Sequence, residues 1–312
     1  MSDNSITQVK NALRVNRTRC ILSVVCCTVI CVCVFLGIVD IMLGEPTELI
    51  QEVGAKSFRM FTVLSNMLMA AAAAMCIPFA VDGLRYRNYH LPRWVVYLLY
   101  SAAVSVAITF AVAGTALSSF AGFHYIMIYR EGKYLHTIVP IAAILLFLVI
   151  NTDHTIPFRV TFLAILPMFL YAVNYVILAF VIGEEGGGWR DHYQFNTYVP
   201  WYLTAVAMFA LAFGIAAGLR VVHNKMHRKR KADFESYFRN SEKSSYPTIE
   251  EAVTALAESD RARDKGGDIT VPRRIVRIME KKYRSGIPLK ELLSIYIKAY
   301  LKEETKEDTL DE

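Results

Sequence analysis

Charged residues are scarce in this chain of 312 residues. Lys, Arg, Asp and Glu together make up 20% of it, whereas hydrophobic residues make up 54%, and the mean hydropathy is +0.34. So little charge excludes a disordered chain and a coiled coil, and the apolar share exceeds that of an ordinary soluble enzyme. The composition therefore indicates a membrane protein.

Metal-binding patterns are also missing. No H-E-x-x-H pattern occurs, and the cysteines lack the paired spacing of a zinc site. All six cysteines fall inside apolar stretches, which is typical of small buried hydrophobic residues rather than of a disulfide framework. The sequence therefore predicts that the protein works without a metal or another cofactor.

Long apolar runs are abundant. About 20 mostly apolar residues cross a bilayer as a helix. The fourth run is the shortest and contains Pro140, so we expect it to be tilted or kinked. The predicted fold is all-α, a polytopic bundle of six transmembrane helices within residues 20–222. The predicted spans are Cys20–Leu43, Phe58–Val81, Trp94–Leu117, Tyr134–Ile150, Phe158–Ile182 and Pro200–Val222.

Basic residues gather at alternate ends of these spans. They precede the first span, occupy the second connection and follow the sixth span, whereas the first and fifth connections are acidic. Cytoplasmic loops carry an excess of Lys and Arg, so this alternation predicts that both termini lie in the cytoplasm. We therefore expect a multi-pass protein of the cell membrane, with a short N-terminus (1–19) and a long C-terminal tail (223–312) on the cytoplasmic side.

The tail from residue 223 contains helix start signals and an amphipathic segment, which are typical of a small helical region. Thr248 and Glu251 form a capping box, Pro272 begins a second helix, and Leu289–Leu301 has one apolar side. That side either packs within the tail, lies on the membrane or contacts a partner protein in the cytoplasm. Basic and acidic residues nearly balance in the tail, so we expect no nucleic-acid partner, and the basic residues closest to the membrane suit anionic lipid headgroups.

Polar side chains at one level of the predicted bundle could carry chemistry. Thr62, Ser65 and Asn66 lie at i, i+3 and i+4, on one face of the second span, and such a face must contact protein or water. By the rise of a helix, Thr62 lies about 6 Å and His136 of the fourth span about 4.5 Å below the outer surface. We therefore expect these side chains to share one layer.

A threonine and a histidine at equal depth indicate nucleophilic catalysis. A hydroxyl becomes a nucleophile when a base within hydrogen-bond distance accepts its proton, and neutral imidazole suits this role near neutral pH. The alternative is structural, since Ser and Thr in spanning helices bond to their own helix and Asn links helices. The candidate catalytic residues are Thr62 and His136, and the candidate binding residues are Ser65, Asn66 (an orienting or oxyanion donor), Asn174 and Tyr202.

Two short motifs resemble a known family. Residues 61–68 read FTVLSNML and residues 134–140 read YLHTIVP. They are similar to the F-T-x-x-S-N and L-H-x-x-x-P patterns of the six-span family of androgen-induced protein and androgen-dependent TFPI-regulating protein, and the Ser-Asn pair is similar to the bacterial relatives. Animal members are intramembrane hydrolases of fatty acid esters of hydroxy fatty acids that use a threonine and a histidine. The resemblance covers the six spans, not the tail, and implies that Thr62 and His136 are this pair.

Two functions of different kinds remain open from the sequence. The first is a hydrolase of lipid acyl esters, for which membrane lipids are the expected partners. The second is a non-enzymatic carrier or scaffold whose cytoplasmic tail binds a partner. Carriers commonly contain internal repeats and broken helices at the midplane. The two halves of this sequence show no repeat, and Pro140 and Pro167 are its only plausible breaks, which disfavours a carrier.

Overall fold

The computed structural model describes residues 3–46, 52–86, 91–150, 154–196 and 199–242. These residues form helices and connections and contain no strand. The chain divides into two units, one of residues 21–79 and 90–230 and the other of residues 1–20, 80–89 and 231–312. The first unit holds the apolar parts of the helices and the polar residues that the sequence singled out.

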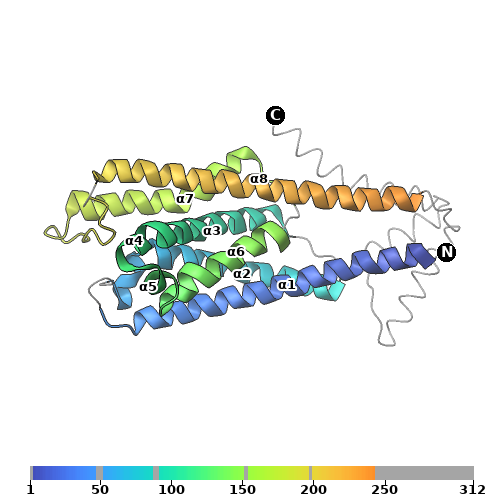
Figure 1. The fold of residues 1–312 in the computed structure, drawn as a ribbon, viewed down its shortest axis with the longest axis horizontal. Coiled ribbons are helices and arrows are strands. Elements are labelled where there is room, and N and C mark those ends of the chain that lie inside the picture. The colour runs from blue at the N-terminus through green and yellow to red at the C-terminus, as the bar shows by residue number, and fades with distance from the viewer. Residues whose placement is uncertain (1–2, 47–51, 87–90, 151–153, 197–198, 243–312) are drawn as a thin grey trace. The chain divides into compact units, whose positions relative to one another are not determined.

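Six helices in the described residues are long and apolar enough to cross a membrane, which confirms the predicted all-helical, multi-pass fold (Figure 1). The first, second and sixth lie within single α-helices, whereas π-helical segments extend the third, fourth and fifth. The elements are α1 (Asp3–Met42), α2 (Phe61–Tyr86), α3 (Arg93–Val112) with η2 (Ala113–Leu117), η3 (Lys133–Ile138), α6 (Val139–Leu145) and η4 (Leu146–Ile150), α7 (Phe158–Tyr175) with η5 (Val176–Ile182), and α8 (Trp201–Glu242).

The connections gather at two ends of the bundle. The described parts of the first, third and fifth connections lie at one end of the first unit, which we call the odd-connection end, and residues 154–157 of the fourth connection lie at the other, the even-connection end (Figure 1). Three short helices lie in the first and third connections, at the odd-connection end. These are the 3₁₀ helix η1 (Gly54–Arg59), α4 (Ser118–Ala121) and α5 (Phe123–Met127).

A small residue lets α1 approach the fourth span closely. A Cβ added at Gly37 would overlap the side chain of Leu135, which is fully buried in η3. Small residues at a helix contact allow the close packing that drives association inside a membrane, where burial of apolar surface adds little. Gly37 therefore fixes η3 against α1, and with it the neighbouring His136.

Polar side chains of α8 bind the fourth connection at the even-connection end. The side-chain oxygen of Asn224 accepts the Ile156 N–H at 2.8 Å, and its amide donates to the Ile156 carbonyl at 3.0 Å. His223 is fully buried, stacks on Phe147 with ring centroids 4.3 Å apart, and has its two ring nitrogens 3.1 and 3.0 Å from the carbonyl oxygens of Phe147 and His154. These contacts join α8 to η4 and to the second half of the fourth connection.

Helix α8 runs past residue 222, the last residue of the predicted sixth span. Helix α8 continues from Trp201 to Glu242, and His223 and Asn224 contact the fourth connection although the sequence analysis placed them in the tail. The tail helices predicted around Thr248, Pro272 and Leu289–Leu301 lie outside the described residues.

Replacing His223 should destabilise the bundle. His223→Leu removes the ring N–H donor that lies between the Phe147 and His154 carbonyls, and a buried group left unpaired costs about 1–3 kcal/mol. We expect the free energy of unfolding in mixed micelles to fall by that amount. The matched control is His124→Leu, because His124 is exposed on α5. Equal stability of the two variants would contradict the structural role of His223.

Candidate functional site

Thr62 lies in the first turn of α2, at the odd-connection end. The helix begins at Phe61, directly after the extended residue Met60 that ends η1. The Thr62 carbonyl accepts the Ser65 hydroxyl at 3.1 Å and the Asn66 amide at 2.8 Å. The two candidate binding residues thus hold the backbone of the candidate nucleophile, while the Thr62 hydroxyl is left for other partners.

His136 approaches that hydroxyl with a defined nitrogen. Its Nδ1 lies 2.8 Å from the carbonyl oxygen of Ile126, and its Nε2 lies 3.4 Å from Thr62 Oγ1. A carbonyl only accepts hydrogen bonds, so Nδ1 carries the proton and, in the neutral ring, Nε2 presents its lone pair to Thr62. The Thr62 O–H therefore donates to His136. Contacts of this kind are commonly long in free enzymes and shorten when substrate binds.

The Ile126 carbonyl is itself held in place by the third connection. Ile126 belongs to α5, which follows Gly122 at φ +87°, a backbone angle that favours glycine. A Cβ added at Gly132 would overlap the Ile126 carbonyl oxygen, so only glycine permits this approach. The Thr137 hydroxyl donates to the next carbonyl, Met127, at 2.6 Å. The side chains of η3 thus pair with the end of α5, and this pairing orients the imidazole.

Asn66 connects the second and fourth spans through a carbonyl that Pro140 leaves without a donor. The Val139 N–H bonds to the Tyr134 carbonyl, five residues earlier, so the next donor in this π-helical pattern would be residue 140 onto Leu135. Proline has no N–H. The Asn66 amide donates to the Leu135 carbonyl instead, at 3.1 Å. The Ser-Asn and L-H-x-x-x-P motifs are therefore joined by one hydrogen bond, and both amide hydrogens of Asn66 are used on carbonyls.

Ser65 makes the corresponding link to the third span. Its hydroxyl lies 3.0 Å from that of Thr109, which also bonds to the Ser105 carbonyl at 3.3 Å. Ser101, Ser105 and Thr109 lie four residues apart on α3 and are all buried. This stripe could have been found in the sequence by the spacing that identified Thr62 and Asn66, and it was missed.

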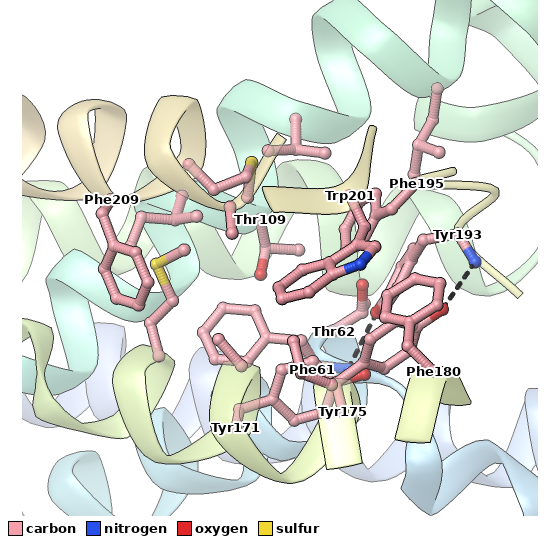
Figure 2. A pocket seen from close by; sticks show the side chains of 18 residues that line it. Phe61, Thr62, Thr109, Tyr171, Tyr175, Phe180, Tyr193, Phe195, Trp201 and Phe209 are labelled. Carbon is pink, nitrogen blue, oxygen red and sulfur yellow. Dashed lines mark hydrogen bonds between the residues drawn. The ribbon is translucent and has the colours of Figure 1, made fainter. Parts of the chain in front are cut away.

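A cavity lies beside Thr62. Its volume, counted as the space open to the centre of a water molecule, is about 80 Å³, and most of the side chains around it are apolar or aromatic. Figure 2 shows the rings of Phe180, Phe195 and Trp201 around this space. The lining residues are Phe61, Thr62, Ile108, Thr109, Val112, Leu117, Met168, Tyr171, Ala172, Tyr175, Val176, Phe180, Tyr193, Phe195, Trp201, Ala205, Met208 and Phe209.

The fifth connection brings a tyrosine hydroxyl to the start of α2. Tyr193 accepts the Phe61 N–H at 2.9 Å, and its hydroxyl also interacts with the side chain of Thr62. The Tyr193 N–H in turn bonds to the Tyr175 hydroxyl at 3.2 Å, and Tyr175 donates to Asp191 at 2.7 Å. Tyr193 lies outside the spans, and burial raises the pKa of its hydroxyl, so the phenol stays protonated at neutral pH. No local sequence pattern indicated this residue.

Two candidate binding residues lie away from the cavity. Asn174 is exposed on α7, although its neighbours Ala172 and Tyr175 line the cavity. Tyr202 is 54% exposed at the start of α8, and it is the preceding residue, Trp201, that lines the cavity. Both residues were chosen by their depth in the spans, and depth does not specify the direction in which a helix presents a side chain. In the described part of the chain, no group of His, Cys, Asp and Glu could hold a metal ion.

The orientation of His136 can be measured directly. In ¹⁵N-histidine NMR spectra, we expect His136, assigned by the loss of its signals in His136→Gln, to be the Nδ1-protonated tautomer. Gly132→Ala should shift that signal, because the added methyl group displaces the Ile126 carbonyl. Gly114→Ala is the control, since a Cβ there makes only an ordinary contact with Met127. An Nε2-protonated His136 in the wild type would contradict the geometry.

No protein-family model, curated protein or solved structure matches this chain. The family resemblance of the two short motifs therefore stays a prediction. What the residues can do depends on the arrangement of Thr62, His136 and the cavity beside them.

Proposed function

We propose that this chain is a membrane-embedded hydrolase of lipid acyl esters, in which Thr62 is the nucleophile and His136 the general base. One observation carries the proposal: the bond from Nδ1 to the Ile126 carbonyl leaves the lone pair of Nε2 facing the Thr62 hydroxyl. A third group that orients the base is the arrangement on which hydroxyl nucleophiles depend. The resemblance of the two motifs to a family of intramembrane hydrolases agrees with the same pair.

The reaction proceeds in two balanced steps. Thr62 Oγ1 attacks the ester carbonyl carbon, a C–O bond forms, and the threonine proton passes to His136 Nε2. The tetrahedral intermediate collapses by breaking the bond to the alcohol, which takes the proton from His136. Water then attacks the acyl-threonine with His136 again as base, and releases the fatty acid and the free hydroxyl.

The cavity supports an apolar acyl group as the part of the substrate that enters. Its wall is formed largely by apolar and aromatic side chains of α3, α7 and α8, and Thr62 is one of the lining residues. A lipid ester presents this combination, because its chain is hydrocarbon and its carbonyl lies near the membrane surface. Lipids of the bilayer are therefore the proposed source of substrate, and the odd-connection end is proposed to face outward, with both termini in the cytoplasm of a cell-membrane protein.

A lipid-like fluorophosphonate should label the purified protein covalently. We expect Thr62→Ala to abolish labelling, and His136→Ala to slow it at least about 10²-fold, as the loss of a general base commonly does. Labelling is measured by in-gel fluorescence and the labelled residue is identified by mass spectrometry.

Matched controls separate catalysis from structural effects. Thr115→Ala removes an exposed hydroxyl that bonds only to the Ala111 carbonyl of its own helix at 2.6 Å, and His124→Ala removes an exposed imidazole. Both variants should label at the wild-type rate. If folded wild type is not labelled, or if Thr62→Ala is labelled as well as wild type, then Thr62 and His136 are helix-linking polar residues and the proposed hydrolase is wrong.

A further inference from the structure

We infer that Tyr193 is a further catalytic residue, which donates a hydrogen bond to the carbonyl oxygen of the substrate when Thr62 attacks. This inference rests on the proposed hydrolase. The fifth connection then supplies the hydrogen-bond donor for the oxyanion, which neither the two sequence motifs nor the spans provide. The class of substrate follows from it, namely an ester or another acyl compound whose carbonyl becomes an oxyanion.

Tyr193 is placed at the reacting atoms by two of its own contacts. Its hydroxyl accepts the N–H of Phe61, the residue before Thr62, at 2.9 Å, and it interacts with the Thr62 side chain itself. The same ring lines the cavity that the acyl group would enter (Figure 2). A carbonyl within attacking distance of Thr62 Oγ1 therefore has the Tyr193 hydroxyl beside it.

The contact with Phe61 also determines what the Tyr193 proton can do. Because the hydroxyl oxygen accepts the Phe61 N–H, its own hydrogen points elsewhere, and the nearby side-chain acceptors are the neutral hydroxyls of Thr62 and Tyr171. An oxyanion accepts a much stronger hydrogen bond than a neutral hydroxyl does. In addition, Phe61 is the first residue of α2, a helix of 26 residues. The partial positive charge at this helix N-terminus makes the Tyr193 O–H a stronger hydrogen-bond donor.

Three other polar side chains near Thr62 have their protons committed to acceptors of the protein. Tyr171 donates to the Arg59 carbonyl at 2.7 Å, and Tyr175 donates to Asp191 at 2.7 Å. Both amide hydrogens of Asn66, the donor suggested by the sequence, bind carbonyls of Thr62 and Leu135. Among the described residues next to Thr62, Tyr193 is therefore the side chain best placed to stabilise the oxyanion.

The electron flow is simple. As Thr62 Oγ1 forms its bond to the carbonyl carbon and its proton passes to His136, the π electrons of the carbonyl move onto oxygen. The Tyr193 O–H stabilises this charge and does not transfer its proton. When the intermediate collapses, the electrons return to the C–O double bond, and the leaving alcohol takes the proton from His136.

Removal of this hydroxyl should slow the chemical step. With a fluorogenic fatty-acyl ester and full-length protein, we expect Tyr193→Phe to lower kcat by about 10²–10³-fold, as loss of one oxyanion donor does, while KM changes little. Labelling by the fluorophosphonate should slow in parallel but still occur on Thr62. The matched control is Tyr202→Phe, which removes a phenol hydroxyl from an exposed residue outside the cavity lining.

An isosteric change tests the same role without removing the contact to Phe61. With 3,5-difluorotyrosine at position 193, the hydroxyl ionises at lower pH, so we expect hydrolysis to fall at a lower pH than in wild type. The pH at which hydrolysis falls would not change if the hydroxyl only held Phe61 in place. The experiment also remains decisive if Tyr193→Phe folds poorly.

The outcomes separate the two proposals. A pH profile unchanged by difluorotyrosine, or a folded Tyr193→Phe with wild-type kcat, overturns the role of Tyr193 and leaves the hydrolase standing. Wild-type protein that neither hydrolyses the ester nor reacts with the fluorophosphonate overturns both.

Discussion

The arrangement of the site depends on one hydrogen bond, from the Asn66 amide to the Leu135 carbonyl. Inside a membrane a buried carbonyl must find a donor within the protein, and Pro140 removes the donor that the fourth span would otherwise supply. Asn66 supplies it from α2 at 3.1 Å. Since Asn66 is one turn after Thr62 and Leu135 directly precedes His136, this bond sets the two candidate catalytic residues side by side.

The pair is then oriented by backbone rather than by other side chains. Ile126 offers only a carbonyl, but that carbonyl determines which nitrogen of His136 carries the proton. Its position depends in turn on Gly132, where no side chain fits. The structural interpretation of the polar stripe on α2 is accurate for Ser65 and Asn66, which link α2 to α3 and to the fourth span. Thr62 differs, because its hydroxyl faces an imidazole and a cavity.

Aromatic and aliphatic side chains cover most of the cavity wall, and the hydroxyls of Thr62, Thr109 and the tyrosines interrupt it. The fifth connection contributes as much to it as the spans do. Asp191 fixes Tyr175, Tyr175 fixes the backbone of Tyr193, and Tyr193 meets the first N–H of α2. The fifth connection thereby contributes side chains to the candidate site that the helices form.

The six spans could be predicted from the sequence, because runs of about twenty apolar residues have few other stable environments. The shared layer of Thr62 and His136 could be predicted as well, because helical rise converts residue number into depth. Which side chains face the cavity could not be predicted, because it depends on how the helices pack. Rotation of α7 and α8 turns Asn174 and Tyr202 away from the cavity, and chain folding over long separations brings Tyr193 to Phe61. Depth is a local property of one helix, whereas direction and loop placement depend on packing between helices, which no local pattern encodes.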